Sequence, residues 1–127
     1  MEKNIPTFIF CHYQLSQTID IDWKYASLGS ESKTIKNILE KYNSKILFFS
    51  GHTHRGLIKK DGGSIVTSKN VTYVSTPSIC KPDTEHYEAD NDNIGTGFII
   101  KLDENDIYIC GYDFMNKKWL EEFKWKK

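Results

Sequence analysis

The chain has 127 residues, about the size of one domain, and is long enough to bury a core of its own. Its 17 basic and 17 acidic residues cancel, so the overall charge favours neither a nucleic acid nor an anionic membrane as partner. No apolar run approaches the length that spans a bilayer. Three widely spaced cysteines, Cys11, Cys80 and Cys110, form no C-x-x-C pair, which indicates reduced thiols and predicts a cytoplasmic protein.

The first element is a short strand. Pro6 precedes a β-prone run at residues 7–11, and this run ends directly at His12. Residues 13–29 show no clean period, so we expect a long loop there, with a turn of helix around residues 23–28.

A helix is predicted next. It begins at Ser30 or Ser32, either of which is a suitable N-cap, and Asn43 and Ser44 stop it. Apolar residues then fall at i, i+3, i+4 and i+7, namely Ile35, Ile38, Leu39 and Tyr42. This spacing places them on one face of a helix.

A buried strand and a histidine-rich turn follow the helix. The apolar run Ile46–Phe49 has no polar break, which is typical of a strand buried on both faces. His52 and His54 come directly after it, and Gly51 would allow a backbone conformation that a side chain forbids. The i, i+2 spacing suits one metal ion or two neighbouring ions, but it also suits ordinary turn residues bonded to backbone or water.

The order strand, helix, strand predicts a parallel pair in one sheet. His12 would then meet His52 and His54 at the carboxyl end of that sheet, where α/β proteins commonly bind ligands. Turn chemistry gives no reason for three histidines to gather there, so the pattern favours a metal site. The alternative is three unrelated polar residues at strand ends.

Beyond Gly56 the pattern predicts antiparallel strands. Short runs at residues 57–58, 64–67 and 71–75 are separated by turns, and an acidic loop with His86 follows at residues 81–93. Residues 95–102 and 107–114 predict a hairpin, and the tail at 119–125 a returning strand. The predicted fold is therefore α/β, one βαβ unit followed by antiparallel hairpins, in a single domain over residues 1–127.

These motifs resemble the carboxy-terminal half of the bacterial calcineurin-like metallophosphoesterases. The family's G-H-x-H motif matches Gly51-His52-Thr53-His54, and its preceding histidine matches His12 in Phe10-Cys11-His12. GTGFIIKL and IYICGYDF are similar to the closing strands of that family, so the resemblance covers nearly the whole chain. It implies a partial β-sandwich and a metal-dependent phosphoric ester hydrolase.

The resemblance also implies a site with two divalent metal ions, Mn, Fe or Zn. His12 and His52 would be ligands of one ion and His54 of the other. Apart from the resemblance, Arg55 lies next to the histidines, where it would either neutralise an oxygen of a phosphate-ester substrate or be an ordinary surface arginine after a turn. Tyr13 and Gln14 follow His12 directly and would line the substrate pocket.

The family's amino-terminal motifs, D-x-H, G-D-x-x-D/N and G-N-H-D/E, do not occur in this sequence. We therefore expect the carboxy-terminal portion of a longer phosphoesterase domain, inactive alone. An apolar sheet face left uncovered by a missing amino-terminal half would bind that half or drive self-association.

Two other functions remain open. One is a non-catalytic binding or regulatory domain with a vestigial histidine site, which exposure of Trp119, Phe123 or Trp125 would favour. The other is a mononuclear zinc hydrolase that uses the three histidines as ligands and keeps one open position.

Overall fold

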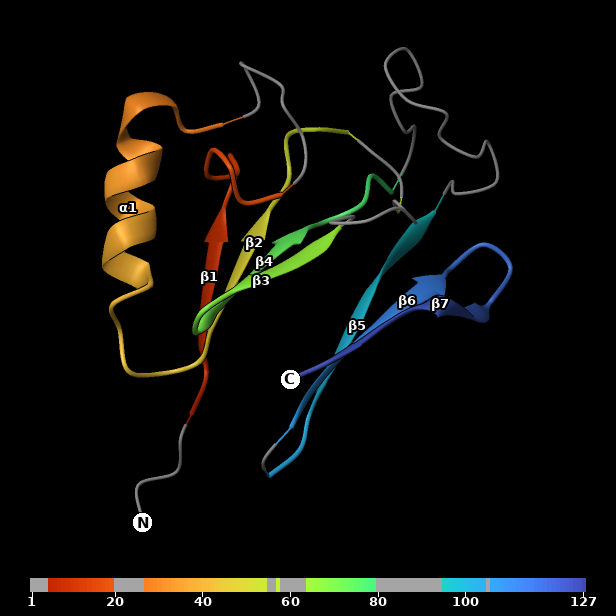
Figure 1. Cartoon of the computed structure of the whole chain (residues 1–127). Coiled ribbons are helices and arrows are strands. Elements are labelled where there is room, and N and C mark those ends of the chain that lie inside the picture. Colours follow the sequence, from red (N-terminus) through yellow and green to blue (C-terminus); the bar gives the residue numbers. More distant parts are fainter. Residues whose placement is uncertain (1–4, 20–26, 55–56, 58–63, 80–94, 105) are drawn as a thin grey trace. The chain divides into compact units, whose positions relative to one another are not determined.

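The computed structural model describes residues 5–19, 27–54, 57, 64–79, 95–104 and 106–127 (Figure 1). They form a mixed α/β structure that is mostly β, with one short α-helix and two sheets. The chain divides into two compact units, residues 1–52 with 61–75 and residues 53–60 with 76–127. Each unit has its own sheet.

The first unit contains a four-stranded sheet in the order β1-β2-β4-β3. Its strands are β1 (Thr7–Cys11), β2 (Ile46–Ser50), β3 (Ile65–Ser68) and β4 (Val71–Ser75). The predicted parallel pairing of β1 with β2 is confirmed, and β3 and β4 form the expected antiparallel hairpin.

The prediction of antiparallel strands alone beyond Gly56 was wrong for β4. This strand lies beside β2 and runs parallel to it, from Val71 opposite Ile46 to Ser75 opposite Ser50. Runs of β-prone residues between turns show where strands occur, but they do not show which earlier strand each one joins. The parallel part of the sheet therefore has three strands.

Burial follows the position of each strand in this sheet. All residues of β2 and β4 are buried, which confirms the interpretation of Ile46–Phe49 as a strand covered on both faces. β1 lies at the edge of the sheet and is only partly covered. Its Phe10 is 74% exposed, although the ring stacks on Phe49 at a centroid distance of 5.1 Å.

The helix α1 spans Ser32–Leu39 and follows a 3-10 turn, η1, at Gly29–Glu31. The predicted N-cap at Ser30 or Ser32 was wrong, because the residue before the helix is Glu31 and its side chain makes no capping hydrogen bond. The chain enters α1 through the 3-10 turn. Glu31 therefore has φ −76° and ψ −16°, not the extended backbone of a capping residue.

The apolar stripe of α1 is only partly buried. Ile35 and Leu39 are partly covered, whereas Ile38 is 57% exposed and Tyr42, three residues after the helix ends, is 64% exposed. The helical spacing therefore identified the helix correctly but not the environment of every residue on its apolar face.

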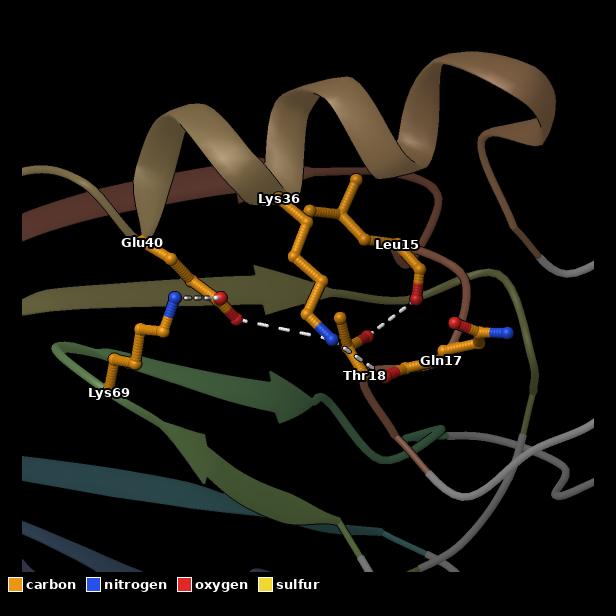
Figure 2. A network of polar contacts seen from close by, with 6 residues as sticks. All are labelled: Leu15, Gln17, Thr18, Lys36, Glu40 and Lys69. Atoms are coloured by element: carbon orange, nitrogen blue, oxygen red, sulfur yellow. Dashed lines mark hydrogen bonds and ion pairs between the residues drawn. The ribbon is translucent and has the colours of Figure 1, made fainter.

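Polar contacts tie α1 to two other segments of the first unit (Figure 2). Lys36 Nζ donates a hydrogen bond of 3.2 Å to the carbonyl oxygen of Gln17, in the loop after β1, and lies 4.0 Å from the Glu40 carboxylate. Lys69, in the β3–β4 turn, lies 3.3 Å from the same carboxylate. Lys36, Glu40 and Lys69 thus connect α1 with the loop after β1 and with the β3–β4 turn.

The loop after β1 also packs into the core. Leu15 and Ile19 are buried, and Thr18 Oγ1 donates a hydrogen bond of 2.5 Å to the carbonyl oxygen of Leu15. These contacts fix the path of the chain just beyond His12.

The charges around Glu40 set its protonation. Its side chain is 8% exposed, and this burial alone would raise the pKa. Hydrogen bonds from Ser68 and Lys69, with the charges of Lys36 and Lys69, outweigh burial and hold the pKa of Glu40 below its ordinary value of 4.5. Burial, together with the Glu40 charge, raises the pKa of Tyr73, so that this phenol stays protonated.

The second unit contains an antiparallel sheet in the order β5-β6-β7. Its strands are β5 (Thr96–Leu102), β6 (Ile107–Asp113) and β7 (Lys118–Lys126). The predicted hairpin and the predicted strand in the tail are both confirmed. The register shifts between Cys110, which lies opposite Lys124, and Gly111, which lies opposite Leu120, so residues 121–123 of β7 have no opposite residue in β6.

At this shift in register, two apolar side chains of β7 pack against Gly111 of β6. Leu120 and Phe123 are buried in a small cluster with Leu57, against which Phe98 packs. A Cβ atom added to Gly111 would lie 2.8 Å from Phe123 Cβ and 3.2 Å from Leu120 Cβ. Only glycine leaves room for both.

Aromatic side chains gather where β6 turns into β7. Tyr112 makes T-shaped contacts with Phe114 and Trp119, at centroid distances of 5.1 and 4.9 Å. Phe114 and Trp119 are each 51% exposed. Asp113 closes the turn, because its carboxylate accepts hydrogen bonds from the Asn116 side chain and backbone N–H, and these hold the pKa of Asp113 below its usual range.

Several predictions fall outside the described residues. These are the helical turn around residues 23–28, the strand and turn at 58–63, the acidic loop at 81–93 with His86, and the residues Arg55, Gly56 and Cys80. Within the described ranges, no helix has both the length and the apolar character needed to cross a membrane.

Replacing Gly111 with alanine should lower the free energy of unfolding by about 1–3 kcal/mol, because the Cβ atoms that it would meet are held close to the β7 backbone. Urea unfolding followed by tryptophan fluorescence measures this loss. Gly97→Ala is the matched control. Its new Cβ would lie 2.7 Å from the Phe114 ring, which is half-exposed and can move toward solvent at a smaller cost. Equal losses in the two variants would refute the close packing at Gly111.

Replacing Glu40 with glutamine should weaken the acid sensitivity of the fold. Because folding lowers the pKa of Glu40, its carboxylate stabilises the folded state above the unfolded pKa, and this contribution is lost as the pH falls below 4.5. Urea midpoints at about pH 6 and about pH 3 should therefore differ less in Glu40→Gln than in the wild type. Glu104→Gln, at an exposed turn, is the control, and an unchanged acid loss in Glu40→Gln would contradict the assignment.

Candidate metal site at the carboxyl end of the parallel strands

The structure brings His12 and His52 together. β1 and β2 are in register up to Cys11 opposite Ser50, so both strands end at the same level of the sheet. His12 Nε2 and His52 Nδ1 lie 2.9 Å apart, within hydrogen-bonding distance. The N–H of Gly51 also donates a hydrogen bond of 3.2 Å to the carbonyl oxygen of His12, which ties the two segments that follow the strands.

Tyr13 packs against both histidine rings. Its ring centroid lies 4.9 Å from that of His12, at an interplanar angle of 80°, and 4.4 Å from that of His52. The two imidazoles are themselves at 76°, with centroids 4.8 Å apart. Three rings in mutual contact limit one another's rotation, so Tyr13 helps to orient the histidine pair.

The backbone beyond β2 adopts an unusual conformation. A positive φ falls on His52 (69°) and His54 (50°) and not on Gly51, so the expectation that Gly51 supplies the special conformation was wrong. Histidine tolerates the left-handed region better than most residues, although it lacks the freedom of glycine. Such backbone strain is common at functional sites, where surrounding contacts hold it in place.

The other candidate residues have different positions. His54 is exposed and belongs to the second unit, so its participation with His12 and His52 stays a prediction. Arg55 lies outside the described residues. Gln14 follows Tyr13 but is buried, and its Oε1 has no hydrogen-bond partner in the described part of the chain.

The distance between the two histidine nitrogens can be compared with the distance between two ligands of one metal ion. Two ligands of one tetrahedral zinc ion, each at about 2.0–2.1 Å, have nitrogens about 3.3 Å apart. The nitrogens of His12 and His52 are 2.9 Å apart in hydrogen-bonding geometry, with one ring nitrogen directed at the other, so the rings would have to turn and separate before both nitrogens faced one ion. Within the ranges that the structure describes, no group of three or more His, Cys, Asp or Glu side chains is arranged to hold an ion.

No protein-family model matches this sequence, and neither a curated protein nor a solved structure matches it. The side chains at the strand ends are therefore the basis for a functional assignment.

Two features of this region were not predicted from the sequence. Tyr13 was expected to line a substrate pocket, and its contact with both imidazoles was missed, although an aromatic residue adjacent to His12 is a signal for it. The other is Ser75, which lies opposite Ser50, so β4 ends at the same level as β1 and β2. The antiparallel interpretation of residues 71–75 concealed this third strand end.

Replacing His52 with glycine should leave a more stable protein than replacing it with alanine, by about 0.5–1 kcal/mol. Both substitutions remove the ring, and only glycine removes the cost of φ 69°. Urea unfolding of the two variants measures the difference. At Thr53, whose φ is not positive, the order should be reversed, because there glycine only adds freedom to the unfolded chain. The same order at both positions would refute strain at His52.

Proposed function

We propose that this chain is the carboxy-terminal portion of a metal-dependent phosphoric ester hydrolase of the calcineurin-like phosphoesterase kind. The observation that supports this most directly is the approach of His12 and His52 to 2.9 Å at the carboxyl end of two parallel strands. The sequence Gly51-His52-Thr53-His54 at the same place agrees with the G-H-x-H motif of that family.

In this proposal the chain contributes imidazole ligands. His12 Nε2 and His52 Nδ1 are the atoms that would hold one divalent ion, Mn, Fe or Zn, and His54 would serve a second. Tyr13 keeps the first two rings in their relative orientation. When bound, such ions activate water for attack on phosphorus and stabilise the charge that develops.

The chain alone is expected to be inactive. Imidazoles are neutral, whereas a pair of divalent ions is normally balanced by carboxylates. The described residues bring no carboxylate into a group with His12 and His52. An amino-terminal half would supply these carboxylates, either by covering the apolar sheet face of this chain or as a separate partner, while Arg55 would contact the phosphate ester.

Calorimetric titration of the chain with zinc and with manganese tests the proposal. We expect zinc to bind, and we expect His52→Ala to weaken that binding at least tenfold, because one of two paired ligands is lost. His86→Ala is the matched control, since it also removes one histidine but not one of the proposed ligands.

Zinc binding that is equal in the wild type and His52→Ala would refute the metal site.

An assay with an aryl phosphate and added manganese tests the expected inactivity. Turnover by the isolated chain that disappears in His52→Ala would show that the chain needs no further carboxylates.

A second function is favoured by one observation. Trp119 is 51% exposed and belongs to the aromatic cluster of the β6–β7 hairpin, as expected for a binding domain whose histidine site is vestigial. Phe123 does not share this role, because it is buried. Absence of histidine-dependent metal binding in the titration would favour this alternative.

A further inference from the structure

β1 has a free side. In the part of the chain that the structure describes, β1 pairs with β2 alone and forms the edge of its sheet (Figure 1). The N–H of Thr7 donates to the carbonyl oxygen of Lys45 at 2.9 Å, on the β2 side. Because backbone groups alternate along a strand, Ile9 and Cys11 also turn toward β2, whereas Phe8 and Phe10 turn their N–H and C=O groups outward.

This edge lacks the usual protection against pairing with another strand. Natural edge strands are commonly blunted by charged side chains, bulges or proline. β1 is regular and uncharged, and residues 5–19 contain no Asp, Glu, Lys or Arg. Ile5 and Phe10 are 73% and 74% exposed. An apolar strand with outward-facing backbone groups is a template for a further strand.

We propose that β1 pairs with β1 of a second copy of this chain, antiparallel, about a two-fold axis at Ile9. In this register Phe8 lies opposite Phe10 of the partner subunit, and Phe10 opposite Phe8 of the partner subunit. These are the two residues of β1 whose backbone groups point outward, so both pairs are hydrogen-bonded pairs. Pro6 would be the next residue to turn outward, and because it has no N–H the pairing is confined to β1.

The side chains are complementary in the same register. Phe8 and Phe10 lie on one face of the sheet, where both rings stack on Phe49, at centroid distances of 6.0 and 5.1 Å. Pairing would place the rings of the two copies side by side and extend this stack across the axis. Cross-strand aromatic pairs of this kind stabilise antiparallel sheets.

The charge pattern favours a second copy over a different protein. A two-fold axis brings identical segments together, so any charge in β1 would meet an equivalent charge nearby, and β1 has none. A dedicated partner strand is commonly selected through complementary charge, which β1 does not offer. Pairing would join two four-stranded sheets into one of eight strands, within the range of open sheets.

The interface is small. One strand pair of five residues on each side buries less than the roughly 1,000 Å² expected of a stable interface. The dimer is therefore weak and dependent on concentration. This inference rests on β1 alone and does not depend on a metal site or on hydrolysis.

A thiol introduced at position 7 tests the register. Thr7 lies opposite Cys11 of the partner subunit in a non-hydrogen-bonded pair, with Cα atoms about 4.5 Å apart, which a disulfide spans. Within one chain, residues 7 and 11 of β1 are about 13 Å apart and cannot be bridged. Thr7→Cys, made with Cys80→Ser and Cys110→Ser, should give a covalent dimer under mild oxidation with glutathione disulfide.

Ile5→Cys in the same background is the control for register. Residue 5 is on the same face of the chain and highly exposed, but its opposite position is 13, so it should form at least tenfold less covalent dimer. Adding Phe10→Lys to Thr7→Cys should also reduce the dimer at least tenfold, because each copy would place a charged lysine opposite Phe8 of the partner subunit in place of an aromatic pair. Tyr42→Lys adds the same charge at an exposed position outside β1 and should leave the yield unchanged.

Amide hydrogen exchange tests the native sequence. Protection of the Phe8 and Phe10 amides should rise with protein concentration, while the amide of Ile9, bonded to β2, should change little. Equal cross-linking through positions 5 and 7 would overturn the proposal. So would protection of Phe8 and Phe10 that is independent of concentration in a chain that sediments as a monomer, because another strand would then occupy the edge.

Discussion

The parallel pairing of β1 with β2 is the constraint on which the rest of the first unit depends. It aligns Cys11 with Ser50, and this alignment alone allows His12 and His52 to meet at 2.9 Å. β4 then adds to the other side of β2 in the same direction, so three strands end at one level. The polar contacts of Lys36 and Glu40 hold α1, the loop after β1 and the β3–β4 turn around this sheet.

Much of the fold could be predicted because the sequence signals are local. An unbroken apolar run specifies β2, helical spacing specifies α1, and paired β-prone runs specify the β5–β6 hairpin. Pairing between distant strands is not local, and this is why β4 was placed wrongly. The N-cap was missed for a similar reason: the conformation of Glu31 is set by the 3-10 turn before it, and not by a preference of Ser30 or Ser32.

The candidate site was predicted in part. Topology and sequence together indicated that His12 and His52 would meet, because both follow strands of one parallel pair. The contact of Tyr13 with both rings and the positive φ of His52 depend on side-chain packing and backbone detail that spacing does not encode. In the second sheet, the requirement for glycine at position 111 of β6 could not be predicted either, because it follows from the packing of Leu120 and Phe123 against that position.

The contact between the two imidazoles also depends on how the chain folds. Their residues are forty positions apart in the chain, so the contact can form only after that long segment has closed, with its entropic cost, and after β1 has found β2. Helix α1 lies within this segment and can form locally beforehand. Among the described strand pairs of the first unit, β1 and β2 join the residues that lie farthest apart in the sequence, so the ring geometry of the histidine pair reports whether that pairing is complete.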